Sequence, residues 1–167
     1  VAIPKVTEGA ACTVLLSEDL IDNDDPLMIA NSDQWINFDI NQYLDYQFNS
    51  NLDGLILTMT ANDPKWSFVR FDDKNKVIEV VEKEVISDEA TVGVYNYKHG
   101  KDFISAAKSM ITKNLRVNGE FYVAPAYNQM IEKGMELGVF NVGNVADGIY
   151  GLGTPEDLNI FLKSGVV

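Results

Sequence analysis

Cysteine, basic charge and long apolar runs are scarce in this chain of 167 residues, and each scarcity excludes a class of protein. Cys12 is the only cysteine, so no internal disulfide can form, and a single thiol fits a reducing, cytoplasmic setting. No segment approaches the roughly 20 apolar residues of a membrane-spanning helix. The first ten residues also lack the basic region and apolar core of a signal peptide. We therefore expect a cytoplasmic protein with no membrane partner.

The shortage of basic residues argues against a nucleic-acid partner. The chain has 13 Lys and Arg against 25 Asp and Glu, a net charge of −12. Proteins that bind nucleic acids need a basic stripe to neutralise phosphates. A small anionic substrate stays open, because a metal ion, a lysine or a helix N-terminus can compensate its charge locally.

Several catalytic motifs are also missing. His99 is the only histidine and lies in a turn before a predicted helix, so neither a zinc site nor a Cys–His nucleophile is expected. No glycine-rich loop of the G-x-G-x-x-G or P-loop type occurs in the sequence.

What is present is an alternation of strand-like and helix-like segments. Continuous or alternating apolar residues predict strands, and apolar residues at every third or fourth position predict helices. The predicted strands cover residues 26–30, 54–61, 90–97 and 135–142, and the predicted helices cover residues 9–21, 38–51, 101–114, 126–134 and 154–165. Residues 66–83 read as an antiparallel hairpin around the turn-rich tip D-D-K-N-K.

This alternation predicts one α/β domain over residues 1–167. We expect a three-layer, Rossmann-like sheet that is mixed but mostly parallel, with the hairpin inserted into it. The apolar run at residues 26–30 is typical of a central parallel strand that is buried on both faces. In such sheets ligands bind beyond the carboxyl ends of the strands, which is where Asp33 would lie.

Asp33 is the first candidate for a functional side chain. One interpretation is an ordinary turn aspartate after a strand. The other is a ligand of Mg²⁺ that accompanies a nucleotide phosphate, because Mg²⁺ is usually held by one or two carboxylates together with waters and phosphate oxygens. The residues alone keep both interpretations open.

Three further segments offer candidates, each with a simpler alternative. Glu82 and Lys83 either belong to a solvated charge run or bind sugar hydroxyls and a phosphate, respectively. Gly9 either belongs to a plain capped helix start or lets the backbone approach a planar base. Glu120 follows a predicted turn and could equally be an acid at a helix start.

Six short motifs, in this order, resemble the sugar nucleotidyltransferases, the pyrophosphorylases that make nucleotide sugars. The closest likeness is to the branch found in capsule and surface-polysaccharide gene clusters. The motifs are T-x-G-A-A from residue 7, N-x-D at 31–33, E-K at 82–83, V-G-V-Y from 92, N-G-E-F-Y from 118 and G-T-P-E-D-L from 153. The resemblance implies a nucleotide-diphospho-sugar transferase fold and a reaction between a sugar 1-phosphate and a nucleoside triphosphate that releases pyrophosphate.

The resemblance also implies roles on the nucleotide side of the site. Glu8 and Gly9 match the segment that recognises the base, and Asp33 matches the catalytic aspartate that binds Mg²⁺. The implied mechanism is in-line attack by a sugar phosphate oxygen on the α-phosphate, which needs no protein nucleophile.

On the sugar side, the resemblance implies roles for four more residues. Glu82 and Lys83 match the pair that grips the sugar and its phosphate, with Lys83 also catalytic. Gly93 matches a strand residue that lines the sugar pocket with its backbone, and Glu120 matches an acid that contacts sugar hydroxyls.

Two departures from the family pattern bear on activity. The family's glycine-rich loop, which ends in an arginine and a Pro-Lys pair, is absent, and I-P-K at residues 3–5 does not replace it. We therefore expect an N-terminally truncated portion of the enzyme that is inactive by itself. The family's second metal-binding aspartate is also missing, since Gly151 or Leu152 stands in its place.

Two rival functions remain. A degenerate, non-catalytic module that binds a nucleotide sugar would explain both departures. A glycosyltransferase of the related fold usually carries D-x-D, whereas N-S-D at residues 31–33 has one carboxylate and D-N-D at 22–24 precedes the strand. The base, the sugar and the oligomeric state, a homo-oligomer included, stay open.

Overall fold

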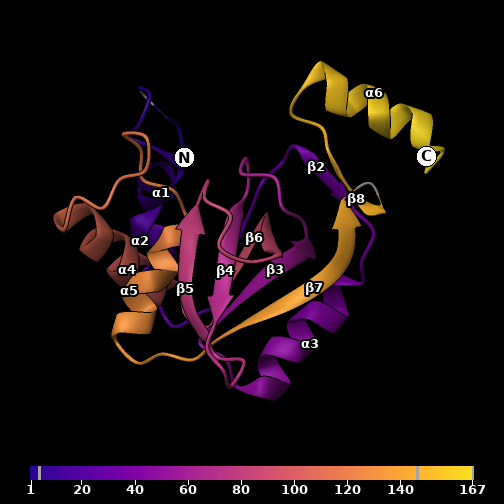
Figure 1. The fold of residues 1–167 in the computed structure, drawn as a ribbon. Coiled ribbons are helices and arrows are strands. Elements are labelled where there is room, and N and C mark those ends of the chain that lie inside the picture. The colour runs from indigo at the N-terminus through magenta and orange to yellow at the C-terminus, as the bar shows by residue number, and fades with distance from the viewer. Residues whose placement is uncertain (4, 146, 167) are drawn as a thin grey trace.

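A computed structural model describes residues 1–3, 5–145 and 147–166, in which eight strands form one sheet with helices on both faces (Figure 1). The strands are β1 (Leu27–Ala30), β2 (Gln34–Ile36), β3 (Gly54–Thr60), β4 (Ser67–Phe71), β5 (Val77–Glu82), β6 (Glu89–Tyr97), β7 (Leu137–Val145) and β8 (Gly148–Gly151). The helices are α1 (Ala10–Leu15), α2 (Glu18–Ile21), α3 (Ile40–Ser50), α4 (Gly100–Thr112), the 3-10 turn η1 (Ala124–Ala126), α5 (Tyr127–Glu132) and α6 (Pro155–Ser164). No helix in these described ranges is long and apolar enough to cross a membrane.

The sheet is mixed, as the sequence predicts. Its strands follow the order β2-β8-β7-β3-β6-β4-β5, and β1 pairs with β6 beside this path. The pairs β3–β7 and β7–β8 are parallel, and the other described pairs are antiparallel. Following these pairings, β1, β3, β4, β7 and β8 share one direction. β4 and β5 form the predicted hairpin.

Strand β1 forms where the apolar run predicts it, but its predicted surroundings are wrong. It pairs antiparallel with β6, its only strand partner among the described residues, so it is not a central parallel strand. Met28 and Ala30 are exposed while Leu27 and Ile29 are half-buried. Because all four residues of β1 are apolar, the sequence pattern hides this alternation between an inner and an outer face.

Two helices begin at residue types that favour helix starts. The Asp39 carboxylate accepts a hydrogen bond from the Asn41 N–H at 2.9 Å, which caps α3. The Thr154 hydroxyl caps α6 by accepting from the Asp157 N–H at 3.1 Å, with Pro155 as the first helical residue. The predicted helix at 9–21 is instead two short helices, α1 and α2.

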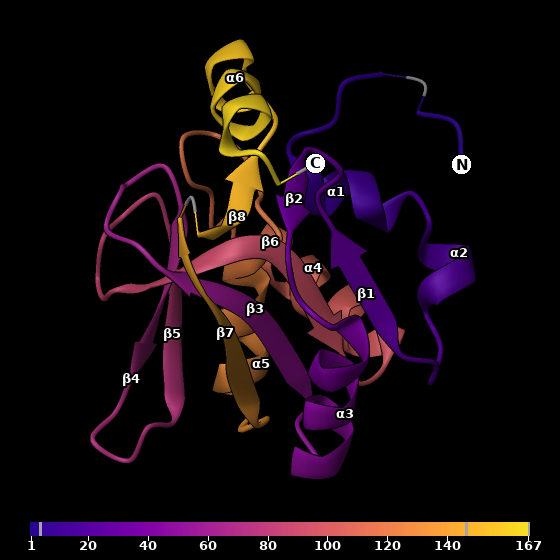
Figure 2. The ribbon, with the colours of Figure 1, turned by 90° about the vertical axis from the view of Figure 1, so that its right-hand side faces the viewer.

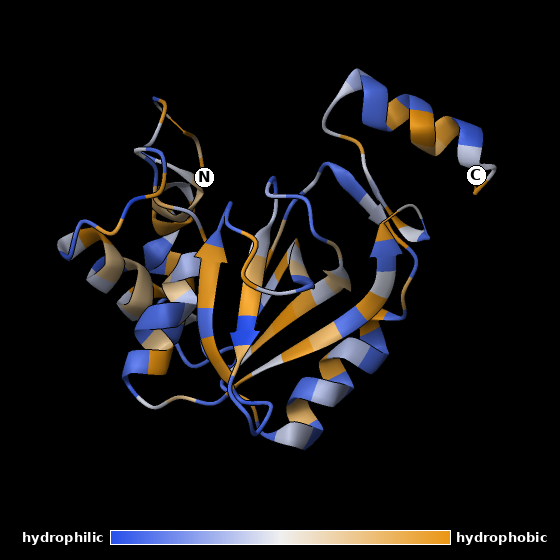
Figure 3. Cartoon of the chain, viewed as in Figure 1, coloured by the Kyte–Doolittle hydropathy of each residue, from blue (hydrophilic) through white to orange (hydrophobic). Residues whose placement is uncertain are grey.

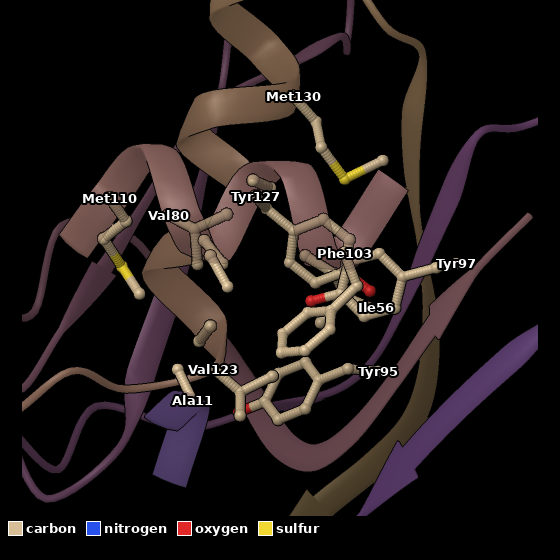
Figure 4. Close-up of a cluster of buried hydrophobic side chains, with 14 of the residues drawn as sticks. Ala11, Ile56, Val80, Tyr95, Tyr97, Phe103, Met110, Val123, Tyr127 and Met130 are labelled. Carbon is tan, nitrogen blue, oxygen red and sulfur yellow. The ribbon is translucent and has the colours of Figure 1, made fainter. Parts of the chain in front are cut away.

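Two hydrophobic clusters hold the layers together. On one face, α4 and α5 cover the sheet around Tyr97 and Tyr127, whose rings stack with centroids 4.7 Å apart (Figure 4). On the other face, α3 places Tyr43 over β3, where the Tyr43 hydroxyl donates to the Leu55 carbonyl at 2.8 Å. Figure 2 shows α3 in front of the sheet and α5 behind it. Each large side chain buried in this way stabilises the fold by about 2 kcal/mol.

Strands β2 and β8 were not predicted, and they connect the sheet to α6. They pair with each other through Trp35 and Tyr150, and Phe161 of α6 packs on both rings. Helix α6 thereby projects from the end of the sheet, and apolar and polar residues alternate along it (Figures 1 and 3). Strands of three and four residues are too short for a periodic signal.

Candidate functional site

Two adjoining cavities lie where the end of β1 meets β4, β5 and β6. The first, here the Lys83 pocket, has a volume of about 340 Å³. The second, here the Asp33 pocket, has a volume of about 330 Å³. Asn31, Lys65 and Trp66 line both cavities. Each volume lies in the range of roughly 300–1,000 Å³ that is usual for small-molecule sites.

The floor of the Lys83 pocket is made of buried hydroxyl groups. Thr91 and Tyr95 of β6 are 2% and 7% exposed, and their hydroxyl oxygens lie 3.1 Å apart in a hydrogen bond. Ser67 of β4 is 5% exposed and donates a hydrogen bond to the Glu82 carboxylate. Burial also raises the pKa of Tyr95 to about 12, so its phenol stays protonated. The floor can therefore exchange hydrogen bonds with the hydroxyls of a ligand.

Glu82 is a half-buried carboxylate at the end of β5. Burial raises its pKa above the ordinary value, while the hydrogen bond from Ser67 and the nearby Lys83 charge lower it. Ser67 stands directly opposite Glu82 in the register of the hairpin. Glu82 is thus held in place with an acceptor oxygen beside the cavity.

Lys83 lines the same cavity as Glu82, although adjacent residues in a strand point to opposite faces. The strand ends at Glu82, and Lys83 adopts a left-handed conformation with φ of 59°. Its N–H donates to the Trp66 carbonyl at 3.0 Å. Its ammonium donates to the Tyr122 hydroxyl at 2.7 Å, which raises the pKa of Lys83. The structure therefore brings Glu82 and Lys83 to one cavity.

Gly93 lets the end of β1 approach β6 closely. The Asn31 N–H donates to the Gly93 carbonyl at 2.8 Å, and Gly93 has φ of 76°. A Cβ at this position would lie 2.4 Å from Nδ2 of Asn31. A glycine here therefore allows the Asn31 side chain to reach the wall that the two cavities share.

The Asp33 pocket contains two carboxylates. Asp33 lies just before β2, its carbonyl accepts from the Leu152 N–H at 2.7 Å, and a Cβ at Gly153 would lie 2.7 Å from its Oδ2. Asp157 lines the same cavity and accepts a hydrogen bond from the Thr154 hydroxyl at 2.7 Å. The described part of the chain has no group of three or more His, Cys, Asp or Glu placed to hold a metal ion. Two carboxylates nevertheless fit Mg²⁺, because phosphate oxygens and waters commonly complete its shell.

Glu8, Gly9 and Glu120 do not line the Lys83 pocket, although the nearby residues Ala10 and Tyr122 do. The Phe121 N–H donates to the Glu8 carbonyl at 2.8 Å, and Glu8 also forms an ion pair with Arg116. Gly9 has φ of 121°, and a Cβ there would lie 2.5 Å from the Phe121 carbonyl oxygen. In this structure, the backbone segment that approaches Gly9 closely is thus that of Phe121. Glu120 is exposed, and its charge contributes to the raised pKa of Lys83.

A match to a protein-family model assigns the chain to a family. The family model for nucleotidyl transferases, described as "Nucleotidyl transferase", matches residues 2–138. The chain belongs to the nucleotidyl transferase family. A search of curated proteins found no match.

Solved structures show that this nucleotidyl transferase shares its fold with two proteins described as pyrophosphorylases and with a putative thymidylyltransferase. The nucleoside-diphosphate-sugar pyrophosphorylase from Vibrio cholerae RC9 superposes with a TM-score of 0.77 at 24% identity, over 96% of this chain and 67% of that one. A putative glucose-1-phosphate thymidylyltransferase from Bacillus anthracis gives 0.75 at 22% identity, over 99% and 65%. A UDP-glucose pyrophosphorylase complexed with UDP-glucose gives 0.73 at 15% identity, over 96% and 61%. The chain thus spans between 61% and 67% of these structures.

Sequence reasoning missed several residues that line the two cavities of this nucleotidyl transferase. Thr91 and Tyr95 stand two residues either side of Gly93, so the two-residue period of a strand could have placed them on the same face. Ser67 could be found only from the hairpin register. Asp157 lies within the predicted helix at residues 154–165, which gave no reason to expect it at a cavity.

The half-buried Glu82 carboxylate predicts a pH-dependent stability. Because the folded protein holds the Glu82 proton more tightly than the unfolded chain does, the free energy of unfolding should fall as pH rises from the ordinary glutamate pKa through the raised one. Glu82→Gln removes this titration, so its stability relative to the wild type should grow across that window. Urea unfolding between about pH 4 and pH 8 measures the difference, with the exposed neighbour in Glu84→Gln as control. If the free energies of unfolding of Glu82→Gln and the wild type changed in parallel with pH, this prediction would be wrong.

Proposed function

We propose that this nucleotidyl transferase joins a sugar 1-phosphate to a nucleoside triphosphate and releases pyrophosphate, with the Lys83 pocket as the sugar-phosphate site. The observation that carries the proposal is the composition of that cavity. A carboxylate, an ammonium group and a floor of buried hydroxyls converge there from β4, β5 and β6. A phosphorylated polyol needs these groups together.

In the proposed complex each group meets a complementary part of the substrate. Glu82 accepts hydrogen bonds from sugar hydroxyls, and the Thr91 and Tyr95 hydroxyls extend this polar floor. Lys83 neutralises the sugar phosphate as a point charge. Gly93 lines the pocket by its backbone, and Glu120 contacts the sugar from the rim. Holding the phosphate oxygen in line with the α-phosphorus supplies most of the rate acceleration.

The nucleotide binds on the side of the Asp33 pocket in this proposal. Asp33 and Asp157 would hold a divalent cation, Mg²⁺ being the best match to two carboxylates. When bound, the cation supplies positive charge beside the phosphates. Glu8 and Gly9 recognise the base from the segment beside Phe121. These assignments rest on the matched motifs and on the cavity that Asp33 and Asp157 line.

The resemblance to the capsule and surface-polysaccharide branch supports a further, finer proposal. The nucleotide sugar would be used in polysaccharide biosynthesis, and the enzyme would work in the cytoplasm, where its triphosphate substrate is made. The fold similarity to nucleotide-sugar enzymes supports the reaction class without specifying the base or the sugar.

A substrate screen tests the proposed reaction directly. The full-length protein is incubated with Mg²⁺, each of four nucleoside triphosphates and a panel of sugar 1-phosphates, and pyrophosphate is measured. We expect release only when both substrates are present and strongest with one pair. Binding of nucleotide sugars without pyrophosphate release would instead support a non-catalytic module. Transfer of a sugar from a nucleotide sugar would support a glycosyltransferase.

The non-catalytic module is the second candidate, because the groups that line the Lys83 pocket can bind a sugar phosphate without turnover. A module of this kind would keep the Lys83 pocket and bind the sugar end of a nucleotide sugar. The same screen, read by calorimetry as well as by pyrophosphate, separates the two candidates.

A further inference from the structure

Lys83 lines the pocket as a cation that forms no ion pair among the described residues. Seven Lys and Arg side chains form ion pairs among the described residues, and Lys83 is not one of them. The chain carries a net charge of −12, and Glu82 and Glu120 both lie close enough to act on Lys83 electrostatically. A flexible lysine in such surroundings would be expected to pair with a carboxylate.

A neutral side chain holds Lys83 instead. The Lys83 ammonium donates to the Tyr122 hydroxyl at 2.7 Å and lies 4.7 Å from the centroid of the same ring. A phenol accepts a hydrogen bond and its ring attracts a cation, yet neither interaction neutralises the charge. The ammonium is therefore restrained while its positive charge is kept.

Tyr122 is well suited to restrain a longer side chain. The residues on both sides, Phe121 and Val123, are buried, at 1% and 6% exposed. The Phe121 backbone is fixed further by hydrogen bonds to Glu8 and Ala11. A tyrosine has only two side-chain torsions, so Tyr122 itself loses little entropy when it restrains the lysine.

We infer that Tyr122 is a positioning residue, which holds the Lys83 ammonium over the pocket and away from Glu82 and Glu120 so that it can receive a substrate phosphate. This inference deepens the proposed function and rests on it. Without Tyr122, Lys83 pairs with one of the two carboxylates. The phosphate must then break an ion pair, and a paired Glu82 is less available to sugar hydroxyls.

Two variants separate the hydroxyl from the ring. Tyr122→Phe keeps the ring and loses the hydrogen bond, and Tyr122→Leu loses both. We expect KM for the sugar 1-phosphate to rise roughly three- to tenfold in Tyr122→Phe and ten- to hundredfold in Tyr122→Leu, from typical values for such contacts. KM for the triphosphate and kcat should change little. Tyr46→Phe on α3 is the matched control, because Tyr46 lines neither cavity. An unchanged KM for the sugar phosphate in Tyr122→Leu would overturn the inference.

A second readout needs no turnover, so it separates failure of this inference from failure of the proposed function. In ligand-free protein, the Tyr122 ring current should shift the Lys83 Hε proton resonances upfield. The shift should persist in Tyr122→Phe and vanish in Tyr122→Leu, with thermal unfolding used to verify that each variant folds. Titration with inorganic phosphate should move the Lys83 signals at lower concentration in the wild type than in either variant. The inference is wrong if the upfield Lys83 shift remains in Tyr122→Leu. It is also wrong if all three proteins bind phosphate with equal affinity, even if pyrophosphate is released.

Discussion

Replacing Asp33 with asparagine should abolish metal-dependent pyrophosphate release and leave the fold intact. The neutral amide is a much weaker ligand for Mg²⁺ than a carboxylate, so we expect the rate to fall by roughly two to three orders of magnitude, as when one electrostatic stabiliser is removed from an active site. The measurement is pyrophosphate release by the full-length protein over a range of Mg²⁺ concentrations.

Asp33 suits this test because its substitution should not disturb the fold. Its side chain is exposed, and no hydrogen bond or ion pair of its carboxylate occurs within the described residues. The free energy of unfolding should therefore change by less than about 0.5 kcal/mol. Asp39→Asn is the matched control, since asparagine caps a helix as well as aspartate does and Asp39 lines neither cavity. Turnover that survives in Asp33→Asn would show that Asp33 is not the metal ligand.

Replacing Gly9 with alanine should destabilise the protein by about 2–6 kcal/mol. Part of this cost is the backbone conformation, because φ of 121° with ψ of 173° is essentially restricted to glycine and costs on the order of 1–3 kcal/mol for a residue with a Cβ. The rest is overpacking, typically about 1–3 kcal/mol, because the new Cβ would lie 2.5 Å and 2.6 Å from the Phe121 carbonyl oxygen and nitrogen. Those two atoms hydrogen-bond to Ala11 and Glu8. The substitution therefore strains the contact that joins the start of α1 to the wall of the Lys83 pocket.

Gly119→Ala isolates the contribution of that contact. Gly119 also has a positive φ, 84°, but a Cβ there would meet no atom within 4 Å. We expect it to cost only the conformational part, about 1–2 kcal/mol. Urea unfolding followed by tryptophan fluorescence measures both variants. Equal losses at the two positions would mean that the Phe121 contact is not tight in solution.

Helix and strand positions were predictable where the local signal was complete. Asp39 and Thr154 cap their helices as the sequence indicates, because a cap is a hydrogen bond between neighbours in the chain. The burial of β1 was not predictable, since Met28 and Ala30 are apolar although their face is exposed. Whether an apolar strand is covered depends on which other elements pack on it.

The residues of the site also divide into those that the sequence indicated and those that only the packing of the elements placed. Motif order pointed to Asp33, Glu82, Lys83 and Gly93, and the structure places each of them at one of two adjoining cavities. Their roles as ligands of metal, sugar and phosphate stay predictions. Asp157 belongs to the G-T-P-E-D-L motif, but the motif assigned it no role in the site. Its position beside Gly151 depends on how α6 packs on β8.

Composition and local order in the sequence determined which classes to exclude, where most helices and strands form, and which family the chain resembles. These follow from residues close together in the chain, whose hydrogen bonds and apolar spacing are local. Only the tertiary structure decided that Lys83 turns into the same cavity as Glu82, and that Tyr122, 39 residues away, holds its ammonium. That meeting depends on how the β4–β5 hairpin and the segment before η1 pack together, and no local pattern in the sequence encodes the distance between them.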